Sequence, residues 1–418
     1  MIASHRWLLR VALLVASVTP PLLQAQDRPE VRIGTQAIGL LTSVEDIPGR
    51  GSLTEARIVQ PVVMLHAGAL HGHLRFTGTL NLEGQTIPRG ELAPGAWGEG
   101  YNDRRHPHTY AHELLLSGID LLGPFDGAGR LSLTAGKGFA PFGSDDPMSR
   151  PVVRYPVNHH LAQVLERAVV IAGYRAGPVF LEGALFNGDE PERPDQWPRV
   201  SRFGDSWSVR LTALPAMGVE FSVSRAKIHS PEHRPGAGKD AWKWHLAARA
   251  DRMVGRVRLY GLAEWARTEE ADGFFVFSSL LAEMAARRGR HRPYYRFERS
   301  DRPEDLRTLD LFRSVRPHLE NSILGITRFT LHTVGYGFAV GPRASPLVLE
   351  PFVEATLGSA QSLDGGVLTP GILYGTTSVR SLSVGLRAAW GMAGHRMGRY
   401  GDLLDAGHEP GMSHDHPM

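Results

Sequence analysis

The chain has 418 residues, of which 46 are basic, 43 are acidic and none is cysteine, and its formal net charge is +3. A balance this close to neutral says little about the partners of the protein. The missing cysteines exclude a fold that depends on disulfides.

The first 25 residues have the features of a secretory signal peptide. Arg6 and Arg10 form a basic start, an apolar run extends over 11–18, and Ala25 offers a small residue for cleavage. The apolar run is too short to cross a membrane as a helix, and no later segment offers a longer one. We therefore expect an exported chain with three parts, which are a signal peptide at 1–25, a folded body at 26–400 and a flexible tail at 401–418.

From residue 31 onward, apolar and polar residues alternate in segments that are mostly about ten residues long. In the stretch RVRLYGLAEWAR, Val257 and Trp265 lie on one face, and Arg256 and Arg258 lie on the other. A period of two predicts half-exposed strands, and ten residues suffice to cross a bilayer at a tilt. The predicted strands are 31–44, 56–66, 73–83, 109–119, 128–138, 167–176, 178–187, 204–213, 218–228, 241–251, 256–266, 274–284, 292–300, 321–340, 346–358 and 378–392.

The connections between these segments alternate in length. Long connections rich in glycine, proline and charge follow the odd-numbered strands from the third onward, with few exceptions, and short ones follow most even-numbered strands. A membrane barrel shows this asymmetry because its two ends face the periplasm and the cell exterior. A soluble β-sandwich would explain the residue alternation but not the loop lengths. We therefore predict an all-β fold, a transmembrane antiparallel β-barrel of about 16 strands (range roughly 14–18), in the bacterial outer membrane.

In such a barrel the apolar face meets lipid and the polar face lines a lumen, which at about sixteen strands is wide enough for water. Basic side chains on the polar face bias a pore toward anions, since the guanidinium fork suits phosphate and carboxylate. The alternative is that these side chains pair with carboxylates of the same wall, such as Glu220, Asp251 and Glu264. The predicted pore-lining residues are Arg75, Arg130, Lys137, Arg210, Lys243, Arg249, Arg258 and Arg387.

Three short motifs resemble one family. GKGFAPFG at 136–143, LERA at 165–168 and ALFNGD at 184–189 are similar to the signature of the phosphate-selective porins of bacterial outer membranes. The signature differs at Gly138, where the family has phenylalanine. The resemblance implies a sixteen-stranded, usually trimeric channel that favours anions.

The segment 139–166 follows the fifth predicted strand and is therefore the third exterior connection. The resemblance implies that this connection folds inward and narrows the pore, and the sequence allows a short helix at 158–166. The residues predicted to form the constriction are Phe139, Pro141, Phe142, Asp145, Asp146 and Arg150.

Histidines are concentrated at two places. His106, His108 and His112 lie on one face of RRHPHTYAHE, and His414 and His416 lie in the tail, which an even strand count places in the periplasm. Histidines spaced in this way can share copper or zinc. The alternatives are solvated histidines or a rim that titrates with pH. We predict no resident cofactor, with copper and zinc as the metals that these histidines would take.

The sequence favours an outer-membrane porin, a water-filled and anion-leaning diffusion channel for small anionic or polar solutes. The expected partners are outer-membrane lipid and two further copies in a homotrimer, with no nucleic acid. One alternative is a copper- or zinc-linked outer-membrane channel or binding protein. Another is an outer-membrane enzyme, because GDSW at 204–207 resembles the start of some lipases; at the beginning of a strand, however, Ser206 is an ordinary lumen residue, and we predict no enzymatic activity.

Overall fold

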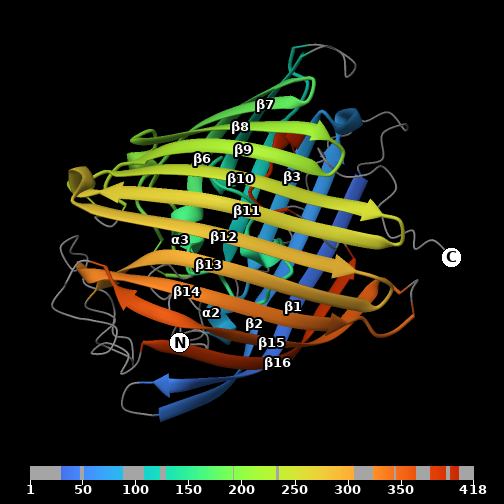
Figure 1. The fold of residues 1–418 in the computed structure, drawn as a ribbon. Coiled ribbons are helices and arrows are strands. Elements are labelled where there is room, and N and C mark those ends of the chain that lie inside the picture. Colours follow the sequence, from blue (N-terminus) through green and yellow to red (C-terminus); the bar gives the residue numbers. More distant parts are fainter. Residues whose placement is uncertain are drawn as a thin grey trace, which may run out of the picture.

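The computed structural model shows antiparallel strands that close into a single barrel (Figure 1). The predicted signal peptide lies outside the residues that the structure describes. These residues are 30–47, 51–87, 108–122, 129–191, 193–231, 235–305, 323–342, 345–363, 377–391 and 396–403.

Each of the sixteen predicted segments overlaps one strand of the barrel, so the predicted fold class is confirmed. The strands are β1 (Glu30–Ile47), β2 (Gly51–Ala69), β3 (Leu74–Asn81), β4 (Ala111–Gly118), β5 (Gly129–Gly138), β6 (Arg167–Ala176), β7 (Val179–Phe186), β8 (Ser206–Ala216), β9 (Val219–Ile228), β10 (Ala241–Val254), β11 (Val257–Glu270), β12 (Phe275–Arg287), β13 (His291–Asp305), β14 (Ile323–Phe338), β15 (Leu347–Ser362) and β16 (Ser378–Gly391).

Helical segments in the described residues are short. They are η1 (Leu70–Gly72), α2 (Glu83–Thr86), η2 (Pro147–Ser149), α3 (His159–Ala162), η3 (Val200–Arg202), η4 (Ala271–Gly273) and η5 (Gly401–Leu403). Within the described part of the chain, none of the helices has the length and apolar character that a membrane crossing requires.

The sheet closes because the first and last strands pair with each other. Each strand pairs with its neighbours in sequence, and β1 pairs antiparallel with β16, with Gly34 opposite Gly391 and Val44 opposite Ser381. Each described strand therefore has a partner on both sides. A bilayer requires this arrangement, because backbone groups at an open sheet edge would have no hydrogen-bond partner in lipid.

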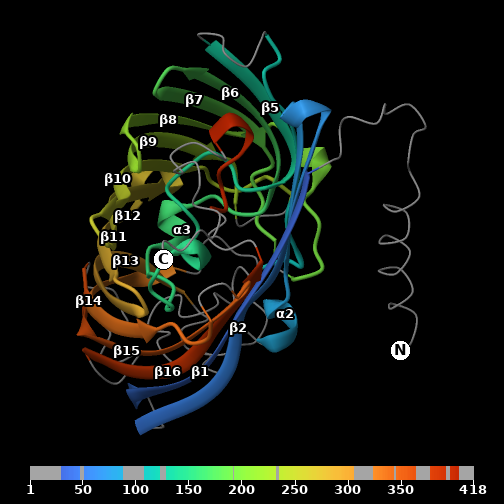
Figure 2. The same cartoon turned by 90° about the vertical axis from the view of Figure 1, so that its right-hand side faces the viewer.

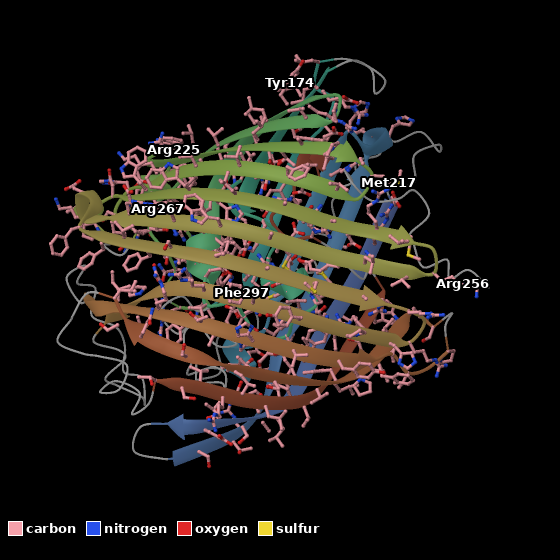
Figure 3. The ribbon with its side chains drawn as sticks, in the orientation of Figure 1. Tyr174, Met217, Arg225, Arg256, Arg267 and Phe297 are labelled. Carbon is pink, nitrogen blue, oxygen red and sulfur yellow. The ribbon has the colours of Figure 1, made fainter. Side chains whose placement is uncertain are left out.

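The two faces of the wall differ in chemistry, as the alternation predicts. In β9, Phe221 and Val223 are 51% and 45% exposed on the outside, whereas Ser222 and Ser224, which alternate with them, are buried inside. Figure 3 shows side chains projecting along the outer surface of the strands, with Tyr174 and Phe297 among those labelled. The barrel is thus apolar toward its surroundings and polar toward its lumen, the pattern of a transmembrane β-barrel.

The two barrel ends are distinguished by their connections. Gly177 and Pro178 alone join β6 to β7, and two residues also join β8 to β9 and β10 to β11, whereas 139–166 and 187–205 lie at the other end. Short turns face the periplasm in barrels of this kind, so β16 ends on the periplasmic side.

Closure of the seam between β1 and β16 depends on a glycine. A Cβ added at Gly385 of β16 would lie 2.4 Å from the Gly39 carbonyl oxygen and 2.8 Å from the Phe352 ring, whereas a Cβ at Gly39 would have no atom within 4 Å. We predict that Gly385→Ala destabilises the barrel by about 1–3 kcal/mol, the usual cost of overpacking. Gly39→Ala is the matched control. Heat-modifiable gel migration against temperature measures both, and equal unfolding temperatures would contradict the prediction.

Candidate functional site

The connection 139–166 lies inside the barrel. Figure 2 shows α3 and the adjoining chain enclosed by the strands. Its contacts reach opposite walls, because the Gly143 N–H donates to Ser224 Oγ of β9 (3.0 Å) and Gln36 of β1 donates to the Met148 carbonyl (3.3 Å). The structure places all the predicted constriction residues in this lumenal segment, each of them buried: Phe139, Pro141, Phe142, Asp145, Asp146 and Arg150.

Carboxylates of the wall hold this segment by its backbone. Glu354 of β15 accepts hydrogen bonds from the N–H groups of Val153 (2.9 Å) and Arg154 (3.2 Å). Glu298 of β13 accepts from the Val157 N–H (2.8 Å) and also pairs with the Arg154 guanidinium. Because such charge-assisted bonds are stronger than neutral ones, the two glutamates fix the course of the segment across β13 to β15.

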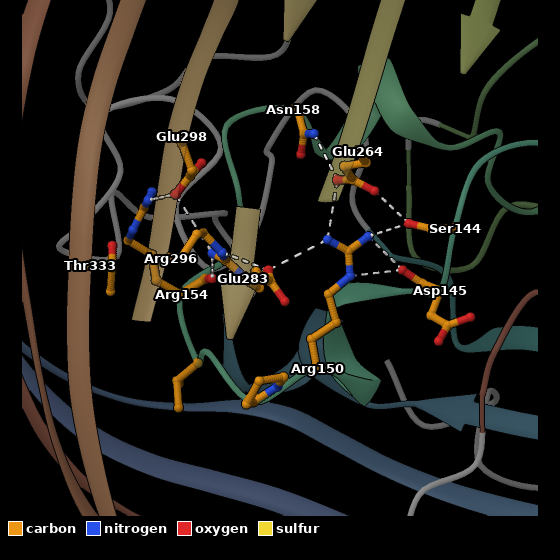
Figure 4. A network of polar contacts seen from close by, with 12 residues as sticks. Ser144, Asp145, Arg150, Arg154, Asn158, Glu264, Glu283, Arg296, Glu298 and Thr333 are labelled. Carbon is orange, nitrogen blue, oxygen red and sulfur yellow. Dashed lines mark hydrogen bonds and ion pairs between the residues drawn. The ribbon is translucent and has the colours of Figure 1, made fainter. Parts of the chain in front are cut away.

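Arg150 joins the segment to β11 and β12, and Figure 4 shows this network. Its guanidinium donates to the Asp145 carbonyl (2.7 Å) and Ser144 Oγ (2.9 Å) within the segment. It also lies 3.3 Å from Glu264 and 3.5 Å from Glu283 on the wall. Burial lowers the pKa of Arg150, but Glu264 and Glu283 outweigh this effect and raise its pKa above the usual value. The arginine therefore stays charged and acts as a structural anchor.

A cluster of histidines and carboxylates joins the segment to β3, β4 and α2. His108 Nδ1 lies 2.8 Å from Glu83, and His112 Nδ1 lies 2.5 Å from Glu166. The His108 ring lies 5.0 Å from that of His112 and 5.7 Å from that of His159, measured between centroids. Burial lowers the pKa of His108, but the hydrogen bond and charge of Glu83 outweigh it and raise the pKa to about 9. His108 is therefore a cation at neutral pH.

This cluster is where the predicted metal ligands His108 and His112 meet. In the described part of the chain, no group of three or more histidine, aspartate or glutamate side chains has an arrangement that could hold a metal ion. His106, His414 and His416 lie outside the described residues. Metal binding therefore stays a prediction, and the geometry of this cluster is that of ion pairs.

The predicted pore-lining side chains occupy the inward face of their strands, but many are engaged with carboxylates. Arg210 makes a bidentate pair with Glu182 (2.6 and 2.9 Å). Arg249 and Arg258 share Asp251 (2.9 and 2.7 Å). For these three arginines, the structure therefore agrees with the alternative expectation that lumenal basic side chains pair with carboxylates of the wall. Arg75, Arg130, Lys137, Lys243 and Arg387 complete the predicted set; among these, Lys137 and Lys243 donate to backbone carbonyls.

A basic cluster at β12, β13 and β16 was largely missed from the sequence. Arg287 and Arg292 both pair with Glu350, and Arg387, which we did predict, lies opposite Glu350 in the strand register. Three guanidinium groups thus surround this carboxylate. Alternation along β13 puts Arg292 on the inward face together with Tyr294, and this pattern could have identified it.

A segment that follows β16 in sequence also lies inside the lumen. Residues 396–403, which we call the lumenal tail, end in η5, and Asp402 pairs with Arg130 (2.8 Å) and Arg175 (3.2 Å). This differs from the prediction of a flexible periplasmic tail from residue 401, because ion pairs with β5 and β6 hold 401–403 inside the barrel. Residues 404–418 lie outside the described part.

Comparison with known proteins gives distant likenesses. No family model and no curated protein matches the chain. Among solved structures, an anion-selective porin from Comamonas acidovorans matches with a TM-score of 0.49 and 11% identity, over 87% of this chain and 100% of that one. OprB of Pseudomonas putida, at high pH, matches with 0.49 and 11%, over 87% and 94%. OmpF of Salmonella typhi, in complex with daunomycin, matches with 0.49 and 10%, over 86% and 97%. The fold assignment rests on the strand pairing described above.

The histidine cluster predicts loss of stability at alkaline pH. The folded-state pKa of His108, about 9, lies above its ordinary value of 6.5, so its stabilising contribution is complete below 6.5 and is lost as the pH rises through 9. We expect the unfolding temperature of the barrel to fall between pH 7 and pH 10. The fall should be smaller in His108→Gln, in which only the other titrating groups respond. An identical fall in wild type and variant would contradict this.

Proposed function

We propose that the chain is a porin of the bacterial outer membrane, a channel through which small solutes diffuse down their gradient. The observation that carries this proposal is the closed sheet with an apolar outside and a charged inside, because this arrangement suits lipid on one face and water on the other. The inward-folded segment 139–166 acts as the constriction of this channel.

The basic cluster supports a preference for anions. Arg287, Arg292 and Arg387 place three guanidinium groups around Glu350 on the inward face. Arg387 also donates to the Pro151 carbonyl of the constriction segment (3.2 Å), so the cluster lies where the segment meets the wall. A surplus of fixed positive charge at a narrow point favours anions.

Phosphate is the first anion to test. Guanidinium groups match the geometry of phosphate oxygens, and the sequence motifs at 136–143 and 184–189 resemble those of phosphate-selective porins. The resemblance also implies a homotrimer, which stays a prediction. The metal-linked alternative gains no support from the described histidines.

We predict that Arg287→Gln combined with Arg387→Gln lowers the anion preference, because the double variant removes two positive charges beside Glu350 and keeps hydrogen-bond donors at both positions. The measurement is the reversal potential in a planar bilayer under a potassium chloride gradient. Added inorganic phosphate should also reduce the chloride current less in the variant than in wild type.

The matched control is Arg225→Gln. Arg225 lies on the outer face against Trp242, with its guanidinium 4.9 Å from the ring centroid (Figure 3). This variant changes the charge of the molecule without changing the lumen. An equal shift of the reversal potential in control and double variant would refute a selectivity role for the cluster, and absence of any current from the folded wild type would refute the proposed channel.

A further inference from the structure

The lumenal tail lies against the side of the barrel formed by β4 to β9. Gly398 donates to Glu113 of β4 (3.3 Å), and its carbonyl accepts from Arg210 of β8 (3.1 Å). Leu403 packs with Phe180 of β7 and Leu214 of β8. Figure 2 shows η5 inside the ring of strands near β6 and β7. The preceding strand, β16, ends at Gly391 on the periplasmic side.

The charges of the tail match those of the wall it covers. Arg396 bridges Asp145 of the constriction segment and Glu220 of β9, at 2.7 Å from each. Arg399 makes a second contact with Glu220 at 2.7 Å. Farther along, Asp402 has the opposite charge and lies between the basic side chains of β5 and β6. The basic side chains of the tail thus face carboxylates, and its acidic side chain faces arginines of the wall.

The tail is also joined to the constriction segment. The Tyr400 hydroxyl accepts a hydrogen bond from the Phe139 N–H (2.9 Å) and donates to Glu113 (2.8 Å). Met397 and Tyr400 belong to the same apolar cluster as Phe139 and Phe142. The exterior connection and the C-terminal segment therefore meet inside the lumen and together occupy this side of it.

Barrel closure does not require these contacts. The seam between β1 and β16 is complete at Gly391, and residues 396–403 add no strand to the sheet. Their contacts with the wall are side-chain ion pairs, hydrogen bonds and packing. Burial and the neighbouring Arg210 lower the pKa of Arg399 to about 10, whereas Asp145 and Glu220 outweigh burial and raise the pKa of Arg396, so the wall stabilises the two cations unequally. These contacts can therefore break without unpairing any strand of the barrel.

We infer that the lumenal tail is a tethered plug. In place, it closes the β4 to β9 side of the lumen beneath the constriction segment; when displaced toward the periplasm, it opens a wider path. This inference rests on the proposed porin function.

The test combines release of the plug with a covalent lock. Arg396→Glu with Arg399→Glu, the release variant, turns both attractions to Asp145 and Glu220 into repulsions while leaving the strands unchanged. The lock is Phe139→Cys with Gly398→Cys. A Cβ at Gly398 lies 3.7 Å from Phe139 Cβ, within the range for a disulfide, and the chain has no native cysteine. Gly398 has φ +83°, so its substitution adds strain.

We expect the release variant to conduct severalfold more than wild type in planar bilayers. In a protein that carries both the release and the lock substitutions, reduced channels should show this larger conductance. Channels oxidised under conditions that favour the docked tail should return to the wild-type value. Arg252→Glu with Arg256→Glu is the matched control, since these arginines are exposed at the same barrel end, and it should conduct as wild type does.

Two results would overturn the inference. One is equal conductance of wild type and release variant, both with folded, heat-modifiable migration. The other is failure of the lock cysteines to form a disulfide in an otherwise wild-type chain, as measured by mass. If the release variant does not fold, Glu220→Gln replaces it in the test. This substitution removes the carboxylate that pairs with both Arg396 and Arg399 and leaves the tail itself unchanged. A wild type without current would instead refute the proposed function, whereas a conducting wild type that the release variant matches refutes only the plug.

Discussion

Closure of the sheet between β1 and β16 is the constraint on which the rest of the structure depends. An open sixteen-stranded sheet would leave two rows of backbone donors and acceptors without partners in lipid, each at a cost of several kcal/mol. Once the seam pairs Gly34 with Gly391, every strand has two neighbours. The alternating side chains then lie on two separate faces, one outside the barrel and one inside it. The apolar face is then solvated by lipid, and the charged face is confined to the lumen.

Charged side chains buried in the lumen would be costly if they were unpaired. They pair with opposite charges on elements that lie far apart in sequence. Arg150 lies 114 residues from Glu264, and Arg396 lies 251 residues from Asp145, yet each pair is in contact inside the barrel. Carboxylates on β11 to β15 hold the constriction segment, and those on β4 and β9 hold the lumenal tail. Removing one partner of such a buried pair leaves the other charge uncompensated, which is why these contacts fix positions strongly. Around Glu350 the guanidinium groups of Arg287, Arg292 and Arg387 outnumber the carboxylate, and the proposed anion preference depends on this local surplus of positive charge.

The strands were predictable because their signal is local. Two-residue periodicity in segments such as 167–176 depends only on neighbouring residues, and the structure has β6 with these same bounds. The inward course of 139–166 was implied by a family resemblance and not by the residues themselves. The pairing of Arg210 with Glu182 is a cross-strand contact between β7 and β8, and strand order alone makes it foreseeable.

Other contacts could not be predicted, since they depend on which walls face each other across the lumen. Nothing local to Arg396 or Tyr400 indicates Asp145, Glu113 or Phe139 as partners. The strand pattern ends at residue 392, and the sequence placed 393–400 in the folded body and 401–418 in a periplasmic tail without indicating a contact for either. For the histidines, the sequence indicated correctly that His108 and His112 lie close together. Their spacing did not indicate that Glu83 and Glu166 lie beside them and form ion pairs.

Amide hydrogen exchange of the protein in lipid bilayers tests closure most directly. We predict that the amides of β1 and β16 along their shared seam exchange as slowly as those between β10 and β11, far from the seam. Rapid exchange confined to the seam, with protection elsewhere, would show an open sheet and would contradict the barrel on which the channel, the constriction and the plug all depend.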